Sequence, residues 1–398
     1  MLDFKQVTLN KVVHAFKRRY LYYRWILLYP LMRYLFPINK HKVCVISWFG
    51  VNFNCNPKAL AVYMSNHVHD LACKVLVIVD YPNIYKGDYP NLVFVRTHSL
   101  RHIYCLATCR VFIANVRMAS FCKRKGQYYV QTWHGTGPKK SEKDSIGTLS
   151  KSYVETAIRD CEQTDLMLSG SGYFSNWIKR STWYKGKILE CGSPRCDVFF
   201  NQEEYEKSKK KVFSEFHVGN DERLIMYAPT FRSLTEIEDY GFDAKKLIGT
   251  LMERFGGKWK LLLRFHPNVA KYPIPDIFSK YLGKEVIDVT RYPDMQDLLC
   301  ASDALITDFS SVSTEFAIQN KPCFLYAPDL DSYDRGLYIK PEQMPFPLAK
   351  MEIELLGVVA GFDEANYKKL VDTYSLFLGN VEKGCACREV VNEIKKYL

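Results

Sequence analysis

The chain has 398 residues, of which 47% are hydrophobic and 25% charged, a composition that excludes an intrinsically disordered protein. Its length favours two domains of fewer than about 200 residues each. The 55 lysines and arginines outnumber the 43 acidic residues, and the net charge of +12 favours a polyanionic partner, whether nucleic acid, acidic lipid or a phosphorylated small molecule.

The amino-terminal segment, residues 1–40, mixes basic residues with large aromatic and aliphatic ones. Lys17-Arg18-Arg19, Arg24 and Arg33 alternate with tyrosines, leucines and a tryptophan. This mixture is typical of an amphipathic helix in the interface of an anionic membrane, here broken near Pro30. The alternative is a helix packed on the protein with a solvated basic face. No signal peptide and no uncharged apolar run of about 18 residues is evident, so we predict a peripheral protein at the cytoplasmic face of the membrane.

From Lys42 onward, short β-branched runs alternate with segments long enough for helices. The first series of predicted strands lies at 43–48, 74–79, 92–95, 111–114, 128–131, 166–169 and 188–191. After a helix-like linker at 202–216, a second series lies at 224–227, 260–264, 286–289, 304–307 and 323–326, followed by a helical tail at 364–398. The alternation predicts an α/β protein with two doubly wound, Rossmann-like domains, 41–205 and 206–398, that face a cleft.

The 13 cysteines include no pair at zinc-ribbon spacing. Five of them lie in apolar runs and are predicted to be small core residues: Cys44, Cys73, Cys105, Cys191 and Cys323. A reducing cytoplasm is the simplest setting for so many thiols.

The most informative loop follows the predicted strand at 128–131 and reads Thr132-Trp133-His134-Gly135-Thr136-Gly137-Pro138-Lys139-Lys140. It places a histidine, two threonine hydroxyls and two lysines at a strand end, where open α/β sheets bind their ligands. Imidazole can take a proton near neutral pH, and paired lysines suit an anionic substrate. The alternative is a strand-end histidine that is hydrogen-bonded to the backbone.

Two loops in the second half also follow predicted strands and carry hydrogen-bond donors. The first offers Thr230 and Arg232. The second offers Arg264 and His266, which strand alternation sends to the same side and which can both donate to phosphate oxygens. The alternative for Arg264 is a salt bridge within its domain.

Two further loops complete the series. In one of them a strand ends at Thr307-Asp308, and Ser310-Ser311 open a predicted helix, either as caps or as an anion site. Glu315 lies about one turn further, where it can reach ribose hydroxyls, although an ordinary solvated helix residue is the alternative. The other loop carries the D-x-D of Asp329 and Asp331, a common pattern that can bind Mg²⁺, and we assign no metal ligand from it.

In this order, five segments resemble the CDP-glycerol glycerophosphotransferase family, which includes the polymerases and primases of teichoic acid synthesis and related capsule polymerases. The segments are QTWHGTGPKK, YAPTFR, RFHP, SDALITDFSS and DLDSYDRGLY. The resemblance implies a GT-B fold with the acceptor in the first domain and the CDP-linked donor in the second. It implies a bacterial enzyme that transfers glycerol phosphate or ribitol phosphate from the CDP-polyol to a hydroxyl of a lipid-linked or polymeric acceptor, releasing CMP.

The resemblance also implies roles for single residues. His134 would be the general base, Arg264, His266, Ser310 and Ser311 would hold the donor pyrophosphate, and Glu315 would contact the ribose. The further donor-side candidates are Thr230, Arg232, Thr307 and Asp308, and the acceptor-side or phosphate-binding candidates are Gly135, Thr136, Lys139 and Lys140. No cofactor is assigned beyond the CDP-polyol substrate, with Mg²⁺ left open, and no nucleic acid partner is expected.

The chain departs from the family pattern at three places. Gly137 precedes Pro138, Glu315 stands where many members have aspartate, and Pro345-Phe346-Pro347 replaces a Pro-Gly-Pro. The last change bears on the pocket around the transferred group. Two other functions remain as alternatives: a GT-B glycosyltransferase that uses a nucleotide sugar, and a basic membrane-surface or nucleic-acid-binding scaffold.

Overall fold

The computed structural model describes residues 23–118, 121–135, 137–230, 240–266, 270, 272–333 and 336–398, the side chains of residues 68 and 69 excepted. Two candidate site residues, Thr136 and Arg232, and the first part of the predicted membrane segment lie outside the described residues.

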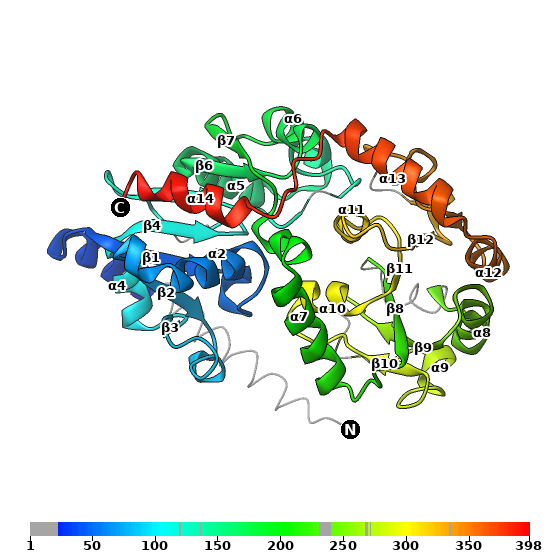
Figure 1. Cartoon of the computed structure of the whole chain (residues 1–398). Coiled ribbons are helices and arrows are strands. Elements are labelled where there is room, and N and C mark those ends of the chain that lie inside the picture. Colours follow the sequence, from blue (N-terminus) through cyan, green and yellow to red (C-terminus); the bar gives the residue numbers. More distant parts are fainter. Residues whose placement is uncertain are drawn as a thin grey trace, which may run out of the picture.

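The first domain is built on a sheet of seven parallel strands in the order β3-β2-β1-β4-β5-β6-β7 (Figure 1). The strands are β1 (Asn39–Ile46), β2 (Lys74–Val79), β3 (Val93–Arg96), β4 (Cys109–Ala114), β5 (Tyr128–Gln131), β6 (Leu166–Ser169) and β7 (Lys187–Glu190). The helices between them are α2 (Cys55–Asn66), α3 (Val68–Leu71), α4 (Leu100–Thr108), α5 (Lys151–Gln163) and α6 (Gly172–Ser181). The central strands are buried on both faces, which explains their nearly continuous β-branched runs.

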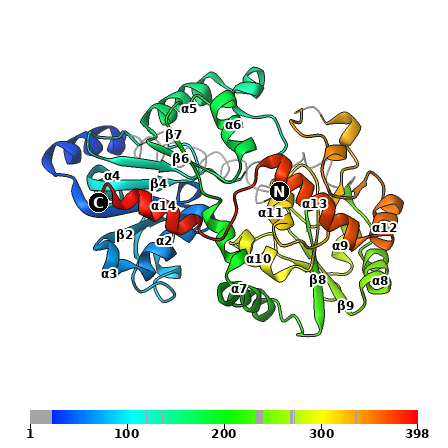
Figure 2. The same ribbon diagram turned by 45° about the horizontal axis from the view of Figure 1, so that its top comes forward.

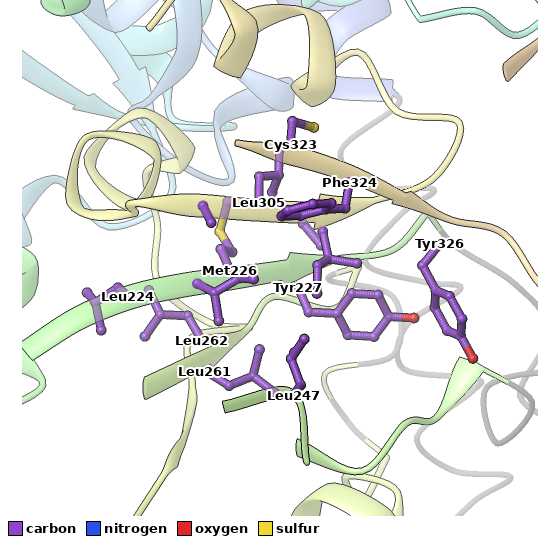
Figure 3. Packing of buried hydrophobic residues seen from close by; sticks show 14 of the residues in the cluster. Leu224, Met226, Tyr227, Leu247, Leu261, Leu262, Leu305, Cys323, Phe324 and Tyr326 are labelled. Atoms are coloured by element: carbon purple, nitrogen blue, oxygen red, sulfur yellow. The ribbon is translucent and has the colours of Figure 1, made fainter. Parts of the chain in front are cut away.

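The second domain repeats the plan with six parallel strands in the order β10-β9-β8-β11-β12-β13. The strands are β8 (Glu222–Ala228), β9 (Lys258–Leu263), β10 (Val286–Asp288), β11 (Ala304–Thr307), β12 (Cys323–Tyr326) and β13 (Leu348–Ala349). The helices are α7 (Gln202–Glu215), α8 (Ala244–Phe255), α9 (Asp276–Ser279), α10 (Met295–Ala301), α11 (Val312–Ala317), α12 (Glu352–Ala360) and α13 (Glu364–Leu378). Side chains of β8, β9, β11 and β12 pack with Leu247 of α8 in its core (Figure 3).

The order of the strands decides where a ligand can bind. In each sheet the winding reverses beside its first strand, between β1 and β4 in one and between β8 and β11 in the other. At such a switch point the loops at the carboxyl ends of the two strands diverge and leave a crevice. The prediction of two parallel α/β sheets is therefore confirmed, and the predicted cysteines Cys44, Cys73, Cys105, Cys191 and Cys323 are all buried.

The C-terminal helix differs from the predicted domain division. We predicted that residues 206–398 belong together, but α14 (Ala386–Lys395) crosses back and packs on the first domain (Figures 1 and 2). Its apolar face, which includes Val390, Val391 and Ile394, completes the core beside α2. The segment that crosses between the domains is held by two backbone hydrogen bonds. The N–H of Gly172 donates to the carbonyl of Gly379 (2.9 Å), and the N–H of Val381 donates to the carbonyl of Gly170 (3.1 Å).

The amino-terminal helix also differs from the prediction, because residues 23–35 stay helical through Pro30. Tyr29, only 4% exposed, anchors the helix to the core and donates a hydrogen bond to the carbonyl of Cys122 (3.0 Å), so tertiary packing holds the helix on both sides of the proline. The opposite face exposes apolar side chains, among them Leu27, Leu31 and Tyr34. Within the described part of the chain, no helix combines the length and apolarity that crossing a bilayer requires.

Candidate active site

The loop after β5 presents the imidazole of His134 in a defined tautomer. Nδ1 of His134 lies 2.7 Å from the carbonyl oxygen of Asn115, at the end of β4. A carbonyl oxygen can only accept, so Nδ1 carries the proton and Nε2 keeps a lone pair. The alternative, a histidine that is hydrogen-bonded to the backbone, is therefore correct for Nδ1. Nε2 keeps its lone pair and can accept a proton.

Aromatic rings fix the plane of this imidazole. Trp133 stacks on it with ring centres 4.9 Å apart, and Trp48, after β1, contacts it at 4.8 Å. Trp133 adopts a φ of 53°, and the buried cation of Arg117 lies 5.2 Å from its ring. Burial lowers the pKa of His134 to about 4, and the cations of Arg195 and Arg117 act in the same direction, against the hydrogen bond to Asn115.

The His134 loop closely approaches the second domain. Gly135 has a φ of +109°, and a Cβ there would lie 2.7 Å from Oγ of Ser311 and 2.6 Å from Nη2 of Arg195. Further along, Lys139 forms an antiparallel bridge with Leu337, and the N–H of Lys140 donates to the carbonyl of Gly336 (3.0 Å). The structure thus brings the loop of Gly135 and Lys139 against two segments that are remote in the sequence, with Gly135 beside Ser311 and Lys139 beside Leu337.

On the donor side, three predicted residues close the switch point of the second sheet. Asp308 follows β11, and Thr230 follows β8. The carboxylate of Asp308 accepts hydrogen bonds from the backbone N–H of Thr230 at 3.0 and 3.1 Å and from the Thr230 hydroxyl at 2.8 Å. Thr307 is fully buried and donates to the carbonyl of Ala228 (2.7 Å). These contacts give Thr307 and Asp308 a positioning role for the loops.

The paired serines differ from each other. Oγ of Ser310 accepts from the N–H of Val312 at 3.4 Å, as a cap does. Ser311 makes no side-chain capping bond at the start of α11, and its Oγ lies toward Gly135. The hydroxyl of Ser311 is therefore placed at the junction of the two domains.

Arg264 and His266 follow β9, and His266 lies near Lys139 of the first domain. Arg264 donates through Nη1 to the carbonyls of Val289 (2.8 Å) and Thr290, so its main contacts are with backbone and not with a carboxylate of its domain. Partial burial lowers the pKa of His266, as do the nearby cations of Lys139 and Arg264. Cations from both domains, Lys139 and Arg264, thus lie near His266, whose neutral imidazole can still donate a hydrogen bond to an anionic donor.

Glu315 is buried and engaged by both oxygens. Oε1 forms an ion pair with Arg195, and Oε2 accepts from Nε2 of Gln296 (2.9 Å). The alternative interpretation of Glu315 as a solvated helix residue is therefore wrong. Its contact with the ribose stays a prediction. Sequence analysis did not identify Arg195, which follows a Gly-Ser-Pro stretch and belongs to none of the motifs that resemble the family.

A pocket lies between the domains beside Gly135 and Ser311. Its polar lining includes Ser169, Ser171, Ser193, Thr314, Asn380 and Glu382. Glu382 accepts from the backbone N–H of Ser193 at 2.9 and 3.0 Å, and burial raises the pKa of its carboxyl to about 7. Within the described ranges, no group of three or more His, Cys, Asp or Glu side chains is arranged to hold a metal ion.

Comparison with known proteins agrees with this geometry. Residues 27–396 match the family of CDP-glycerol:poly(glycerophosphate) glycerophosphotransferases. The chain is 27% identical to a teichoic acid poly(glycerol phosphate) polymerase of Bacillus spizizenii strain W23, over 90% of this chain and 93% of that protein. It is 30% identical to a teichoic acid glycerol-phosphate primase of Bacillus subtilis strain 168, over 72% of this chain and 75% of that protein. The match to the poly(glycerol phosphate) polymerase of Bacillus subtilis strain 168 covers only 49% of that longer protein.

A solved structure gives the same result. A variant of the wall teichoic acid polymerase TagF, determined with CDPG, superimposes with a TM-score of 0.81 at 25% identity, over 100% of this chain and 98% of that one. The sequence motifs had predicted this family, and the match over nearly the whole chain confirms the prediction. The chain belongs to the CDP-glycerol:poly(glycerophosphate) glycerophosphotransferases, a family of transferases.

Proposed function

We propose that this protein transfers a polyol-phosphate unit, with glycerol phosphate as the first candidate, from a CDP-linked donor to a hydroxyl of a teichoic acid or related acceptor, releasing CMP. The two domains would form a GT-B-like pair with the acceptor on the first and the donor on the second. The observation that carries the proposal is the pairing of a neutral, oriented imidazole at His134 with cationic and hydroxyl groups of both domains around Ser311.

The chemistry follows from these groups. Nε2 of His134 removes the proton of the acceptor hydroxyl as its oxygen attacks the phosphorus that bears the polyol. The bond from that phosphorus to the bridging oxygen breaks, and its electron pair leaves with CMP. Lys139, His266 and the hydroxyl of Ser311 would stabilise the charge that develops on the phosphoryl oxygens; the short approach of Ser311 to the His134 loop and the proximity of Lys139 to His266 support this assignment. The new bond is a phosphodiester.

The proposal extends to the identity of the transferred polyol and to attachment of the protein to a membrane. CDP-ribitol is the second candidate donor, because the proposed roles concern the pyrophosphate more than the polyol. The exposed apolar face of helix 23–35, with Arg24 and Arg33 on the same helix, supports attachment to an anionic membrane at its cytoplasmic face, where a lipid-linked acceptor would be reached.

The released nucleotide distinguishes phosphotransfer from glycosyl transfer. Purified protein is incubated with CDP-glycerol, CDP-ribitol or a UDP-sugar, in each case with a short poly(glycerol phosphate) acceptor, and the nucleotides are separated by chromatography. Acceptor-dependent CMP from a CDP-polyol is expected, and the better donor identifies the polyol. Release of UDP, with no CMP from either CDP-polyol, would establish a glycosyltransferase instead.

The low pKa of His134 predicts an unusual pH profile. Because burial lowers this pKa to about 4, the imidazole stays neutral throughout the physiological range and can act as a base. We expect kcat/KM for CMP release to show no titration of this group near pH 6.5 and to fall about tenfold per pH unit only below about pH 4, within the range where the protein stays folded. A half-maximal rate near pH 6.5 that His134→Ala abolishes would contradict this prediction.

A further inference from the structure

Two side chains from outside the His134 loop hold three consecutive carbonyls of that loop. Nδ2 of Asn56, on α2, donates to the carbonyls of Thr132 (3.2 Å) and Trp133 (3.1 Å). Nη2 of Arg195, in the 3-10 helix η4 (Pro194–Phe200) after β7, donates to the carbonyl of His134 (2.9 Å). The two holders are also joined, because the N–H of Arg195 donates to Oδ1 of Asn56 (3.1 Å). The backbone that carries the imidazole is therefore fixed at every residue from 132 to 134.

Arg195 extends this hold to the second domain through its ion pair with Glu315 of α11. Glu315 is in turn held by Gln296 of α10. Only 10% of the Arg195 side chain and 12% of the Glu315 side chain is exposed, so water cannot replace either partner. One guanidinium thus contacts the loop that carries the proposed base and the helix that follows Ser311.

We propose that Arg195 is a positioning residue that sets the place of the His134 imidazole relative to the donor-binding loop of the second domain. The planar guanidinium suits this task, because the two N–H groups of Nη2 diverge in a fixed plane and serve the His134 carbonyl and the Glu315 carboxylate at once. Gly135 agrees with the same assignment, since any side chain there would enter the space that Arg195 and Ser311 occupy. Glu315 then acts as the partner of Arg195. The catalytic part of this inference rests on the proposed function.

The test removes the pair without leaving a buried charge. In the double variant Arg195→Met with Glu315→Gln, both partners are neutral and of similar size, so the fold should survive, which thermal unfolding verifies. We expect kcat for CMP release to fall about 10- to 100-fold, because misplacement of a base by about 1 Å has effects of that order, while KM for CDP-glycerol changes less than about threefold. The single variant Arg195→Lys keeps the charge but loses the fork and should give an intermediate kcat.

A matched control removes a different ion pair between the domains. Nζ of Lys58 lies 2.5 Å from Asp294, and among the described residues neither side chain bonds to the His134 loop. The variant Lys58→Met with Asp294→Asn should keep kcat within about threefold of wild type, because the loop carbonyls keep their holders.

A second readout needs no substrate. We expect the pKa of the His134 imidazole, followed by NMR titration, to rise from its low value toward the ordinary 6.5 in the Arg195 double variant and also in Arg195→Lys, which keeps the cation that itself lowers this pKa, since a released loop is better solvated, and to stay unchanged in the control. Wild-type kcat together with an unchanged imidazole pKa in the double variant would overturn the proposal. If the wild type releases no CMP from CDP-glycerol or from CDP-ribitol, the proposed function fails, and the titration, with Arg195→Lys as the charge-conserving variant, decides whether Arg195 positions the loop.

Discussion

Replacement of His134 by alanine is expected to lower the rate of CMP release by about 10²- to 10⁴-fold, the range that a positioned general base contributes. The reason is that Nε2 is the basic atom of the loop, its partner nitrogen being occupied by the Asn115 carbonyl. The measurement is kcat for acceptor-dependent CMP release at saturating CDP-glycerol. Binding of the donor, measured by calorimetry, should change little, since the imidazole acts on the acceptor.

The chain offers a matched control for this substitution. His67, at the end of α2, also places Nδ1 near a backbone carbonyl, that of Tyr63 at 2.8 Å, but it is exposed and outside the site. His67→Ala should keep kcat within about twofold of wild type. A His134→Ala enzyme that retains more than about a tenth of the wild-type kcat would rule out the role of base.

The second large effect is expected at Gly135. An alanine Cβ there would approach Oγ of Ser311 to 2.7 Å and Nη2 of Arg195 to 2.6 Å, and the φ of +109° is unfavourable for any residue with a side chain. The loop must shift, and with it the imidazole of the adjacent His134. We expect Gly135→Ala to lower kcat by about 10²-fold, because catalysis depends on placement within fractions of an ångström.

Gly147 provides the control for that prediction. A Cβ at Gly147 meets no heavy atom within 4 Å, so Gly147→Ala should leave kcat within about twofold. Near-wild-type activity of Gly135→Ala would mean that the loop of the working enzyme is not held against Ser311.

The parts of the fold that the sequence predicted correctly are those encoded by local patterns. Buried parallel strands require continuous apolar runs, and the predicted runs at 111–114, 128–131 and 304–307 correspond closely to β4, β5 and β11. Because the loops after parallel strands lie at one edge of a sheet, strand-end motifs are expected beside a cleft, and Gly135 and Ser311 from two such motifs do line one pocket. The pairing of the two loops depends on how the domains dock, which no local pattern encodes.

The features that sequence analysis predicted wrongly or missed depend on contacts between distant parts of the chain. The apolar face of α14 fits either domain in principle, and only the tertiary structure shows that it covers the first. Arg195 follows a Gly-Ser-Pro turn, and its importance comes from His134 and Glu315, which are remote in the sequence. Thr307 and Asp308 were correctly placed at a strand end, but whether a polar side chain there binds ligand or backbone is decided by packing around it.

The most direct test of the central claim is ³¹P NMR of the complete reaction, with CDP-glycerol, a defined poly(glycerol phosphate) acceptor and catalytic amounts of the protein. Phosphotransfer predicts that the pyrophosphate signals of the donor are replaced by two signals in equal amounts, the phosphomonoester of CMP and a new phosphodiester on the acceptor. Loss of pyrophosphate with formation of CMP and free glycerol phosphate would show hydrolysis, and no change in the donor signals would show that CDP-glycerol is not the substrate. Either result would contradict transfer of glycerol phosphate from CDP-glycerol to the acceptor.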